Sequence, residues 1–183
     1  MVDYSKIPFA EPGDINIMNA NKGRRVTVLK KFMGDISNLK TLDVGAPNLF
    51  GQLLGIKDNT LETDLNWEVL APSKDYDLIL CSELLEHVCN PLLLMDGLRK
   101  LLKPGGRVIL ATPKRFPFWV TSKKHLTEYK RDRLEILFRY AGFEVKKYQT
   151  IRLWDWWFAF CGFRPFIRTV FTRSHLWELH DIR

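Results

Sequence analysis

The segment from residue 77 to residue 111 places the tightest constraint on the fold of this chain. An apolar run, Leu78–Cys81, leads directly into polar and ionisable residues at Ser82–His87. One helix length later the chain reaches a Lys-Pro-Gly-Gly stop at Lys103–Gly106, and then a second apolar run at Arg107–Ala111. Buried strands joined by a helix lie parallel in one sheet, and open sheets of this kind bind ligands at the carboxyl ends of their strands. We therefore expect residues 82–87 to lie at the functional edge of the sheet.

Strand and helix signals alternate along most of the chain. Apolar and alternating runs predict strands at residues 41–45, 60–64, 78–81, 107–111, 143–149 and 175–182. Helical spacing predicts helices at residues 17–33, 48–55 and 131–141, and a further helix that is capped by Asn90 and carries Leu94 and Leu98 on its apolar face. The alternation predicts an α/β fold with a doubly wound, mostly parallel sheet. No linker divides the 183 residues, so we expect a single domain.

The composition is that of a folded globular protein. Hydrophobic residues make up 46% and charged residues 27%, which excludes an intrinsically disordered chain. The net charge of +7 is compatible with an anionic partner or a membrane surface, and equally with the ordinary bias of a basic enzyme. The cysteines, Cys81, Cys89 and Cys161, form no CxxC pair, so we expect a reducing compartment, no disulfide and no metal site. No signal-peptide pattern and no apolar run of ~18 residues is seen, and we expect a cytoplasmic protein.

Two features near the first predicted strand favour a nucleoside site. The strand ends at Gly45, where a missing side chain lets a ligand approach the backbone. Asp64 ends the next predicted strand and could accept hydrogen bonds from both hydroxyls of a ribose. A tight turn explains the glycine equally well, and a surface carboxylate explains Asp64. Only the two together, with the strand at 78–81 beside them, favour the functional interpretation.

Residues 41–149 resemble the class I S-adenosylmethionine-dependent methyltransferases, in particular the small single-domain type common among O-methyltransferases of quinone, lipid and sugar pathways. The resemblance rests on four segments in order, with Tyr140–Phe143 as a fifth cue: Leu42–Asn48, Thr63–Asn66, Tyr76–Pro91 and Leu101–Pro113. It implies a Rossmann-like, seven-stranded sheet whose last strand is antiparallel. It also implies that S-adenosylmethionine lies across the carboxyl ends of the parallel strands.

The resemblance assigns the cofactor residues. Those expected at the methionine half are Asp43, Gly45, Ala46, Pro47 and Asn48. Asp64 would hold the ribose with Leu65 beside the adenine, Asn66 belongs to the same segment, and Cys81, Ser82 and Glu83 would lie under the cofactor near its sulfonium. Pro47 stands where the family has a second glycine, and it offers no backbone N–H. The segment between Asp64 and Tyr76 is also shorter than the family's helix and strand. We interpret this as an abbreviated strand; alternatively, Asp64 ends the third family strand.

The reaction defines the candidate catalytic residues. Methyl transfer from a sulfonium is an in-line displacement, so the protein must align the acceptor and exclude water. His87 is the candidate base for an acceptor hydroxyl, because the ordinary pKa of histidine lies near neutrality. Glu83 or Glu86 would orient His87 or hold the acceptor. Alternatively, Glu86 and His87 bond only to the loop backbone. We interpret His125 as a structural turn residue in a loop that could close over substrate.

Aromatic residues are concentrated at the C-terminus, where residues 151–183 hold four tryptophans and five phenylalanines. We predict an N-terminal lead at 1–40, a cofactor-binding core at 41–150, an aromatic and basic insertion at 151–174 and a final strand at 175–183. The insertion could form a lid over an apolar acceptor, contact a membrane, form a dimer interface, or merely cover one face of the sheet.

Several function classes follow from these patterns. The leading interpretation is methyl transfer to an oxygen or nitrogen of a small or lipid-like acceptor. A nicotinamide-dependent oxidoreductase shares the glycine turn and the ribose acid, but no GxGxxG is present. A catalytically degenerate fold that serves as a binding or scaffold subunit is suggested by Pro47. A nucleic-acid binder or modifier is suggested by the positive charge, although the Asn/Asp-Pro-Pro-aromatic tetrad of base-amine methyltransferases is missing after Leu78–Cys81.

Overall fold

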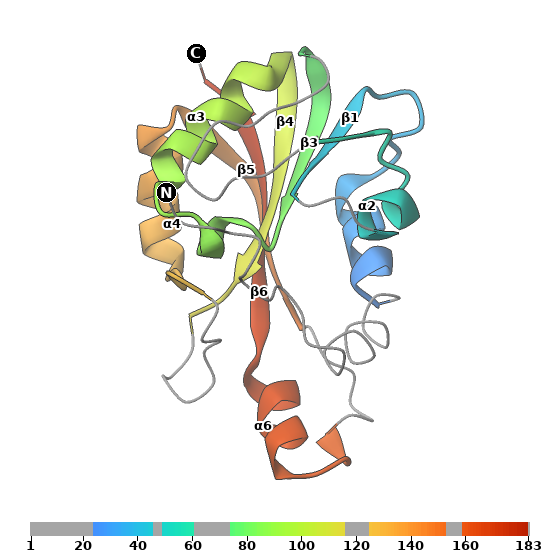
Figure 1. Ribbon diagram of the computed structural model, residues 1–183, viewed down its shortest axis with the longest axis vertical. Coiled ribbons are helices and arrows are strands. Elements are labelled where there is room, and N and C mark those ends of the chain that lie inside the picture. Colours follow the sequence, from blue (N-terminus) through green and yellow to red (C-terminus); the bar gives the residue numbers. More distant parts are fainter. Residues whose placement is uncertain (1–23, 46–48, 61–73, 116–124, 153–158, 183) are drawn as a thin grey trace, which may run out of the picture.

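A central sheet carries helices on both of its faces (Figure 1). The computed structural model describes residues 24–45, 49–60, 74–115, 125–152 and 159–182. Helices α3 (Pro91–Leu101) and α4 (Arg131–Tyr140) lie on one face. Helix α2 (Leu49–Leu54) and an N-terminal helix, residues 24–33, lie on the other. The doubly wound α/β fold predicted from the sequence is confirmed.

The sheet is mostly parallel with an antiparallel edge. Its strands are β1 (Thr41–Val44), β2 (Asp58–Asn59), β3 (Tyr76–Ser82), β4 (Leu102–Pro113), β5 (Phe143–Arg152) and β6 (Arg173–Asp181). The strand order is β2-β1-β3-β4-β6-β5. β2, β1, β3 and β4 are parallel to one another, whereas β6 is antiparallel to both β4 and β5. The antiparallel last strand is confirmed. The described residues form six strands, and segment 61–73, where a further strand was expected, lies outside them.

The second strand differs from the prediction of residues 60–64. β2 comprises Asp58–Asn59 and ends before Thr60, while residues 61–64 lie outside the described residues. The Thr60 hydroxyl donates to the carbonyl oxygen of Gly45 at 2.9 Å and accepts from the amide of Gly45 at 3.2 Å. The Thr60 amide also donates to the Asp43 carbonyl at 3.2 Å, so both the backbone and the side chain of Thr60 hold the end of β2 against β1.

Local signals explain helix α3. The Asn90 side chain accepts a hydrogen bond from the Leu93 amide at 3.1 Å, and Pro91 occupies the first turn, where its missing N–H costs nothing. Leu94 and Leu98 are buried, as their spacing predicts. The helix ends at Leu101, and β4 begins at once and includes the Lys-Pro-Gly-Gly segment.

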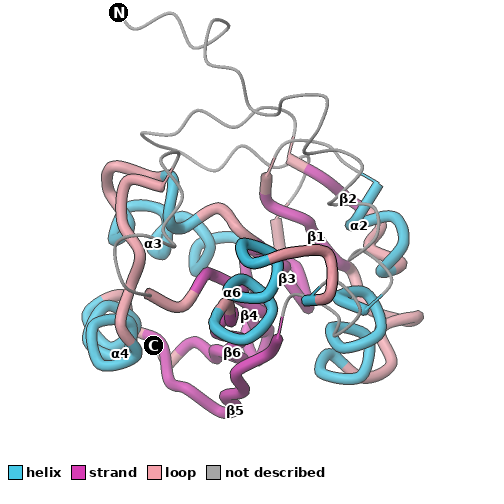
Figure 2. The backbone as a smooth tube through the Cα atoms, turned by 90° about the horizontal axis from the view of Figure 1, so that it is seen from below, coloured by secondary structure: helices cyan, strands magenta, loops and turns pink. Residues whose placement is uncertain are grey.

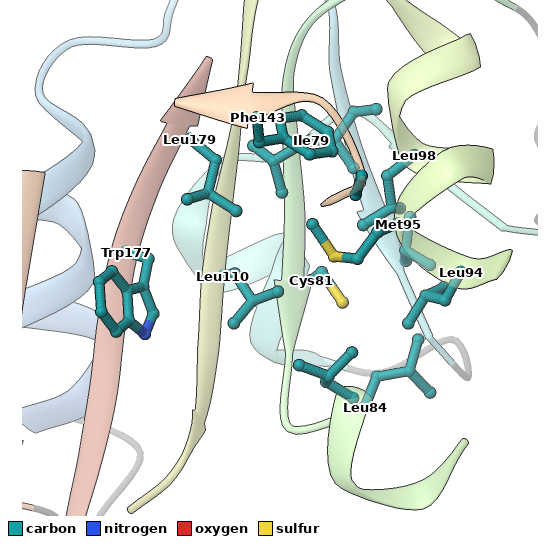
Figure 3. Close-up of a cluster of buried hydrophobic side chains, with 14 of the residues drawn as sticks. Ile79, Cys81, Leu84, Leu94, Met95, Leu98, Leu110, Phe143, Trp177 and Leu179 are labelled. Atoms are coloured by element: carbon teal, nitrogen blue, oxygen red, sulfur yellow. The ribbon is translucent and has the colours of Figure 1, made fainter. Parts of the chain in front are cut away.

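Alternate residues of β3 supply two cores. Ile79 and Cys81 pack with Met95 of α3 and Trp177 of β6 on one face (Figure 3). Leu78 and its partners Leu80, Ile109, Leu29 and Phe32 form the other core, under the N-terminal helix. Successive side chains of a strand point to opposite faces, so a strand buried on both sides is apolar throughout.

Helix α6 (Phe163–Phe171) precedes β6 and lies below the lower end of the sheet (Figure 1). Seen from below, it lies in front of the sheet (Figure 2). Phe160 and Phe163 are 88% and 80% exposed, whereas Trp177 is fully buried against Phe138 with ring centroids 5.2 Å apart. Trp177 is therefore a core residue. The aromatic residues 153–158 lie outside the described residues. None of the described helices is both long and apolar enough to cross a membrane.

Candidate active site

Gly45 leaves an open face at the end of β1. Its φ is +149°, and a β-carbon placed there would meet no atom within 4 Å. The Thr60 hydroxyl, bonded to both polar groups of its backbone, fixes this position. Ala46, Pro47 and Asn48, which should continue the turn, lie outside the described residues.

Asp43 is buried at the end of the same strand. Burial raises the pKa of its carboxyl to about 6, and its Oδ2 has no hydrogen-bond partner among the described residues. Helix α2 approaches this carboxylate closely, since a β-carbon at Gly51 would lie 2.3 Å from Oδ2. A small pocket of about 110 Å³ opens between α2 and β2, lined by Asp43, Gly51, Gln52, Ile56, Lys57, Asp58 and Asn59.

Cys81 contributes no side chain to this edge. Its thiol is fully buried in the core beside Met95 (Figure 3), and burial, with smaller contributions from the charges of Glu86 and Asp43, raises its pKa. Cys81 was expected under the cofactor. The structure leaves only its backbone for such a contact, because the alternation along β3 turns the thiol toward α3.

Glu83 lies at the centre of the edge. It adopts a left-handed φ of 55°, unusual for a residue with a side chain and held there by surrounding contacts. Its amide donates to the Ala111 carbonyl at 2.8 Å, and its carboxylate accepts from the Ser174 hydroxyl at 3.1 Å. The same oxygen lies 3.2 Å from Arg25, whose guanidinium also donates to the Ser82 hydroxyl at 3.4 Å. Glu83 therefore joins β4, β6 and the N-terminal helix.

Glu86 is the most deeply buried acid of the site. Its Oε2 accepts a hydrogen bond from the Thr112 hydroxyl at 3.0 Å, and its Oε1 faces Nε2 of His87 at 3.9 Å. Burial, and to a smaller extent the charge of Glu83, raises the pKa of this carboxyl. Because Glu86 is fully buried, it can act on an acceptor only through His87.

His87 lies beside His125, which comes from the loop before α4. The two rings form an edge-to-face pair with centroids 5.0 Å apart. Nδ1 of His125 lies 2.7 Å from the Glu128 carboxylate. The backbone carbonyl of Glu86 accepts hydrogen bonds from the amides of Leu126 and Thr127 at 2.8 and 3.2 Å. The Glu86 carbonyl thus bonds to the loop backbone, but its carboxylate accepts from Thr112 and faces His87, so the alternative that Glu86 bonds only to the loop backbone is wrong.

His175, at the start of β6, was not identified from the sequence. It is buried, and Nδ1 lies 2.9 Å from the Tyr148 hydroxyl. Burial, and then the charge of Lys114, lowers the pKa of its imidazole to about 4. His175 is consequently neutral at physiological pH.

The structure brings several of the expected site residues together. Asp43 and Gly45 end a strand that pairs in parallel with β3, with Val44 opposite Cys81. Ser82 ends β3 at the same edge, and Glu83, Glu86 and His87 follow it. Asp64, Leu65 and Asn66 lie outside the described residues, so their convergence with Gly45 stays a prediction.

Sequence reasoning missed four contributors to this edge: Arg25, Thr112, Glu128 and Ser174. Arg25, Thr112 and Ser174 contact Glu83 or Glu86 from distant parts of the chain. Glu128 contacts His125, three residues away, which the sequence analysis interpreted as a structural turn residue. Arg25 resembled an ordinary solvated charge of a basic helix, and no local pattern distinguishes it.

Known proteins share parts of this sequence. A ubiquinone biosynthesis O-methyltransferase of Psychrobacter cryohalolentis is 35% identical over 83 residues, which are 42% of this chain and 32% of the relative. The same enzyme of Vibrio cholerae is 36% identical over 61 residues, 33% of this chain and 25% of the relative. The match thus spans about a third or less of the curated relatives.

Solved structures share the fold at low identity. A possible histamine N-methyltransferase of Thermotoga maritima superposes with a TM-score of 0.60 at 18% identity, covering 84% of this chain and 86% of that one. A putative methyltransferase of Bacillus halodurans gives 0.55 at 15% identity, covering 84% and 97%. The family model for a methyltransferase domain matches residues 12–148. Because this match spans most of the chain and the fold agrees, the chain belongs to the methyltransferase domain family.

Proposed function

We propose that this protein transfers the methyl group of S-adenosylmethionine to an oxygen or nitrogen of a small, lipid-like acceptor. The observation that carries the proposal is the juxtaposition of the β1 end, with Asp43 and Gly45, and the β3 end, with Ser82–His87. Membership of the methyltransferase family supports the reaction class. The relatives named as ubiquinone biosynthesis O-methyltransferases support a quinone-like phenol as the acceptor.

The described residues fit such a cofactor. Gly45 offers an open backbone face, and Asp43 offers a buried carboxylate oxygen without a partner among the described residues. Ser82 and Glu83 would complete this part of the site, while Ala46, Pro47, Asn48, Asp64, Leu65 and Asn66 would supply the rest. When bound, S-adenosylmethionine supplies a methyl group on a positively charged sulfur.

Charge at the edge also suits that ligand. The carboxylates of Asp43 and Glu83 come from neighbouring strands and would favour a cationic centre between them. Arg25 lies against Ser82 and Glu83, and a guanidinium there is suited to the carboxylate of an amino acid. We assign Arg25 a binding role that the sequence alone did not predict.

His87 is the proposed base. Its side chain is partly exposed at 27%, so an acceptor can reach it, whereas Glu86 behind it is closed to solvent. The Glu86 carboxylate would stabilise the imidazolium that forms when His87 takes a proton from an acceptor hydroxyl. Glu83 would position the acceptor or the cofactor from the other side.

The C-terminal segment would complete an apolar acceptor site. Phe160, Phe163 and Phe166 are exposed and belong to the segment that precedes β6, which starts at the functional edge. Exposed aromatic side chains also suit a membrane surface or a second copy of the chain. A cytoplasmic location with such a contact stays a prediction, which liposome flotation of the wild type and of Phe163→Ser would test.

Ligand-dependent unfolding tests the proposed function. S-adenosylhomocysteine at 100 times its Kd should stabilise the protein by about 2.7 kcal/mol, and NAD should not. Asp43→Asn should lower this response, whereas Glu144→Gln, on the exposed side of β5, should retain it. If S-adenosylhomocysteine has no effect at any concentration, the transferase proposal is wrong and the scaffold alternative is favoured.

A further inference from the structure

The ligating atoms of Glu86, His87 and His125 converge at the functional edge. One such atom from each residue lies within 4.8 Å of those of the other two. Glu86 and His87 belong to the short 3₁₀ helix after β3, whereas His125 belongs to the loop before α4. Two imidazoles and one carboxylate form a ligand set typical of divalent transition metals.

The Glu86 carboxylate is a second and independent indication of a cation. It is fully buried, and its Oε1 has no hydrogen-bond partner among the described residues. This oxygen points toward Nε2 of His87 across 3.9 Å, which is too long for a hydrogen bond. Two ligands of a tetrahedral ion lie about 3.4 Å apart. An ion would therefore draw these two atoms together by about 0.5 Å, and the widest pair of the three, which is up to 4.8 Å apart, by up to about 1.4 Å.

Neighbouring side chains already orient the ligands. The Thr112 hydroxyl fixes Oε2 of Glu86, and the Glu128 carboxylate lies 2.7 Å from Nδ1 of His125. A carboxylate at Nδ1 favours the tautomer with the proton on that nitrogen, which leaves Nε2 to donate its lone pair to a metal. Metal-bound histidines have this outer contact as a rule.

The backbone connects the two segments that carry the ligands. The amides of Leu126 and Thr127 both donate to the Glu86 carbonyl, and the ring of His125 packs edge-on against His87. Binding an ion would therefore cost little ordering of the chain. It would also compensate a buried carboxylate whose only ion pair among the described residues is with His87 at 3.9 Å.

We propose that Glu86, His87 and His125 bind one divalent transition metal ion, such as Zn²⁺, Mn²⁺ or Fe²⁺. Imidazole ligands disfavour Mg²⁺ and Ca²⁺, which prefer oxygen. Three protein ligands leave positions for water or for an oxygen of the acceptor. An ion lowers the pKa of a hydroxyl that coordinates it, so it would take over the task that the proposed function assigns to the His87 imidazole. The sequence analysis expected no metal, because the cysteines form no CxxC pair; it did not consider Glu86, His87 and His125 together, since His125 is distant in the chain.

Titration calorimetry of the chelator-treated full chain with Zn²⁺, Mn²⁺ and Mg²⁺ tests the proposal. We expect one ion per chain, with Mg²⁺ the weakest. His87→Ala and His125→Ala should each weaken binding at least ~10-fold, and Thr112→Val and Glu128→Gln by ~10-fold to 100-fold. His180→Ala is the matched control, since His180 pairs with Glu178 on β6. The visible absorption of bound Co²⁺ should report nitrogen ligation in the wild type and change in both ligand variants.

Two results would overturn the metal site: wild-type binding of less than one ion per chain, or unchanged affinity in the doubly substituted His87→Ala, His125→Ala chain. Thermal unfolding shows whether each variant is folded. If a variant that lacks a ligand does not fold, Glu128→Gln, which removes no ligand, still tests the site. S-adenosylhomocysteine binding is measured on the same samples. If the protein binds S-adenosylhomocysteine but no metal, only the ion site is refuted. If it binds metal but no S-adenosylhomocysteine, only the transferase proposal is refuted.

Discussion

Arg25 of the N-terminal helix contacts the carboxylate of Glu83, just beyond β3, at 3.2 Å. The guanidinium also reaches the Ser82 hydroxyl and lies 5.4 Å from the centre of the Phe50 ring. The pair is partly buried, so solvent screens it only in part. One side chain thus connects the N-terminal helix, α2 and the functional edge.

Arg25→Met should weaken S-adenosylhomocysteine binding by roughly tenfold, about 1.4 kcal/mol, because a charged contact to the ligand is lost. Stability should change by only ~1 kcal/mol, since the ion pair is partly exposed. Calorimetry and urea unfolding measure the two effects. Arg131→Met, which removes an exposed pair with Glu135, is the control. Equal ligand affinity in wild type and Arg25→Met would show that Arg25 has only a structural role.

Gly51→Ala should destabilise the protein by ~1–3 kcal/mol, the usual cost of forcing an extra methyl group into a close-packed site. The new β-carbon would lie 2.3 Å from Oδ2 of Asp43, so α2 or the carboxylate must move. Gln52→Ala, exposed on the same helix, should have little effect. Urea unfolding measures the free energy of unfolding of both variants. Similar free energies would mean that α2 is not packed tightly against Asp43.

Asp43 should make the protein less stable as the pH rises. Burial raises its pKa from 3.8 to about 6, so the folded state binds this proton more tightly than the unfolded state does. The free energy of unfolding therefore falls between pH 3.8 and 6, by about 3 kcal/mol at most. Asp43→Asn should gain stability relative to wild type between pH 4 and pH 7, as measured by urea unfolding. If the stability difference between Asp43→Asn and wild type is the same at pH 4 and pH 7, the pKa of Asp43 is ordinary and this prediction is wrong.

His175 should have the opposite effect. Burial lowers its pKa from 6.5 to about 4, so the unfolded state takes up the proton first as the pH falls. The stability that neutral His175 contributes is present above pH 6.5 and is lost between pH 6.5 and 4. His175→Gln, which can still bond to Tyr148, should lose less stability than wild type between pH 7 and pH 5. If thermal unfolding shows the same loss of stability in His175→Gln and wild type between pH 7 and pH 5, the pKa of His175 is not lowered.

The sequence alone determined the elements whose signals are local. Asn90 caps α3 by bonding to an amide three residues away, and Leu94 and Leu98 face the core because helical spacing puts them on one side. The apolar run at 78–81 became a central strand because both of its faces are covered. Residues 82–87 therefore lie at the carboxyl edge, and that much of the site could be predicted.

Only the tertiary structure decided which side chains meet at that edge. Thr112 reaches Glu86, and His125 reaches His87, only after β4 has folded beside β3 and the following loop has returned. Such contacts depend on strand order and loop path, and no short stretch of sequence encodes either, so the surroundings of the site could be known only from the fold.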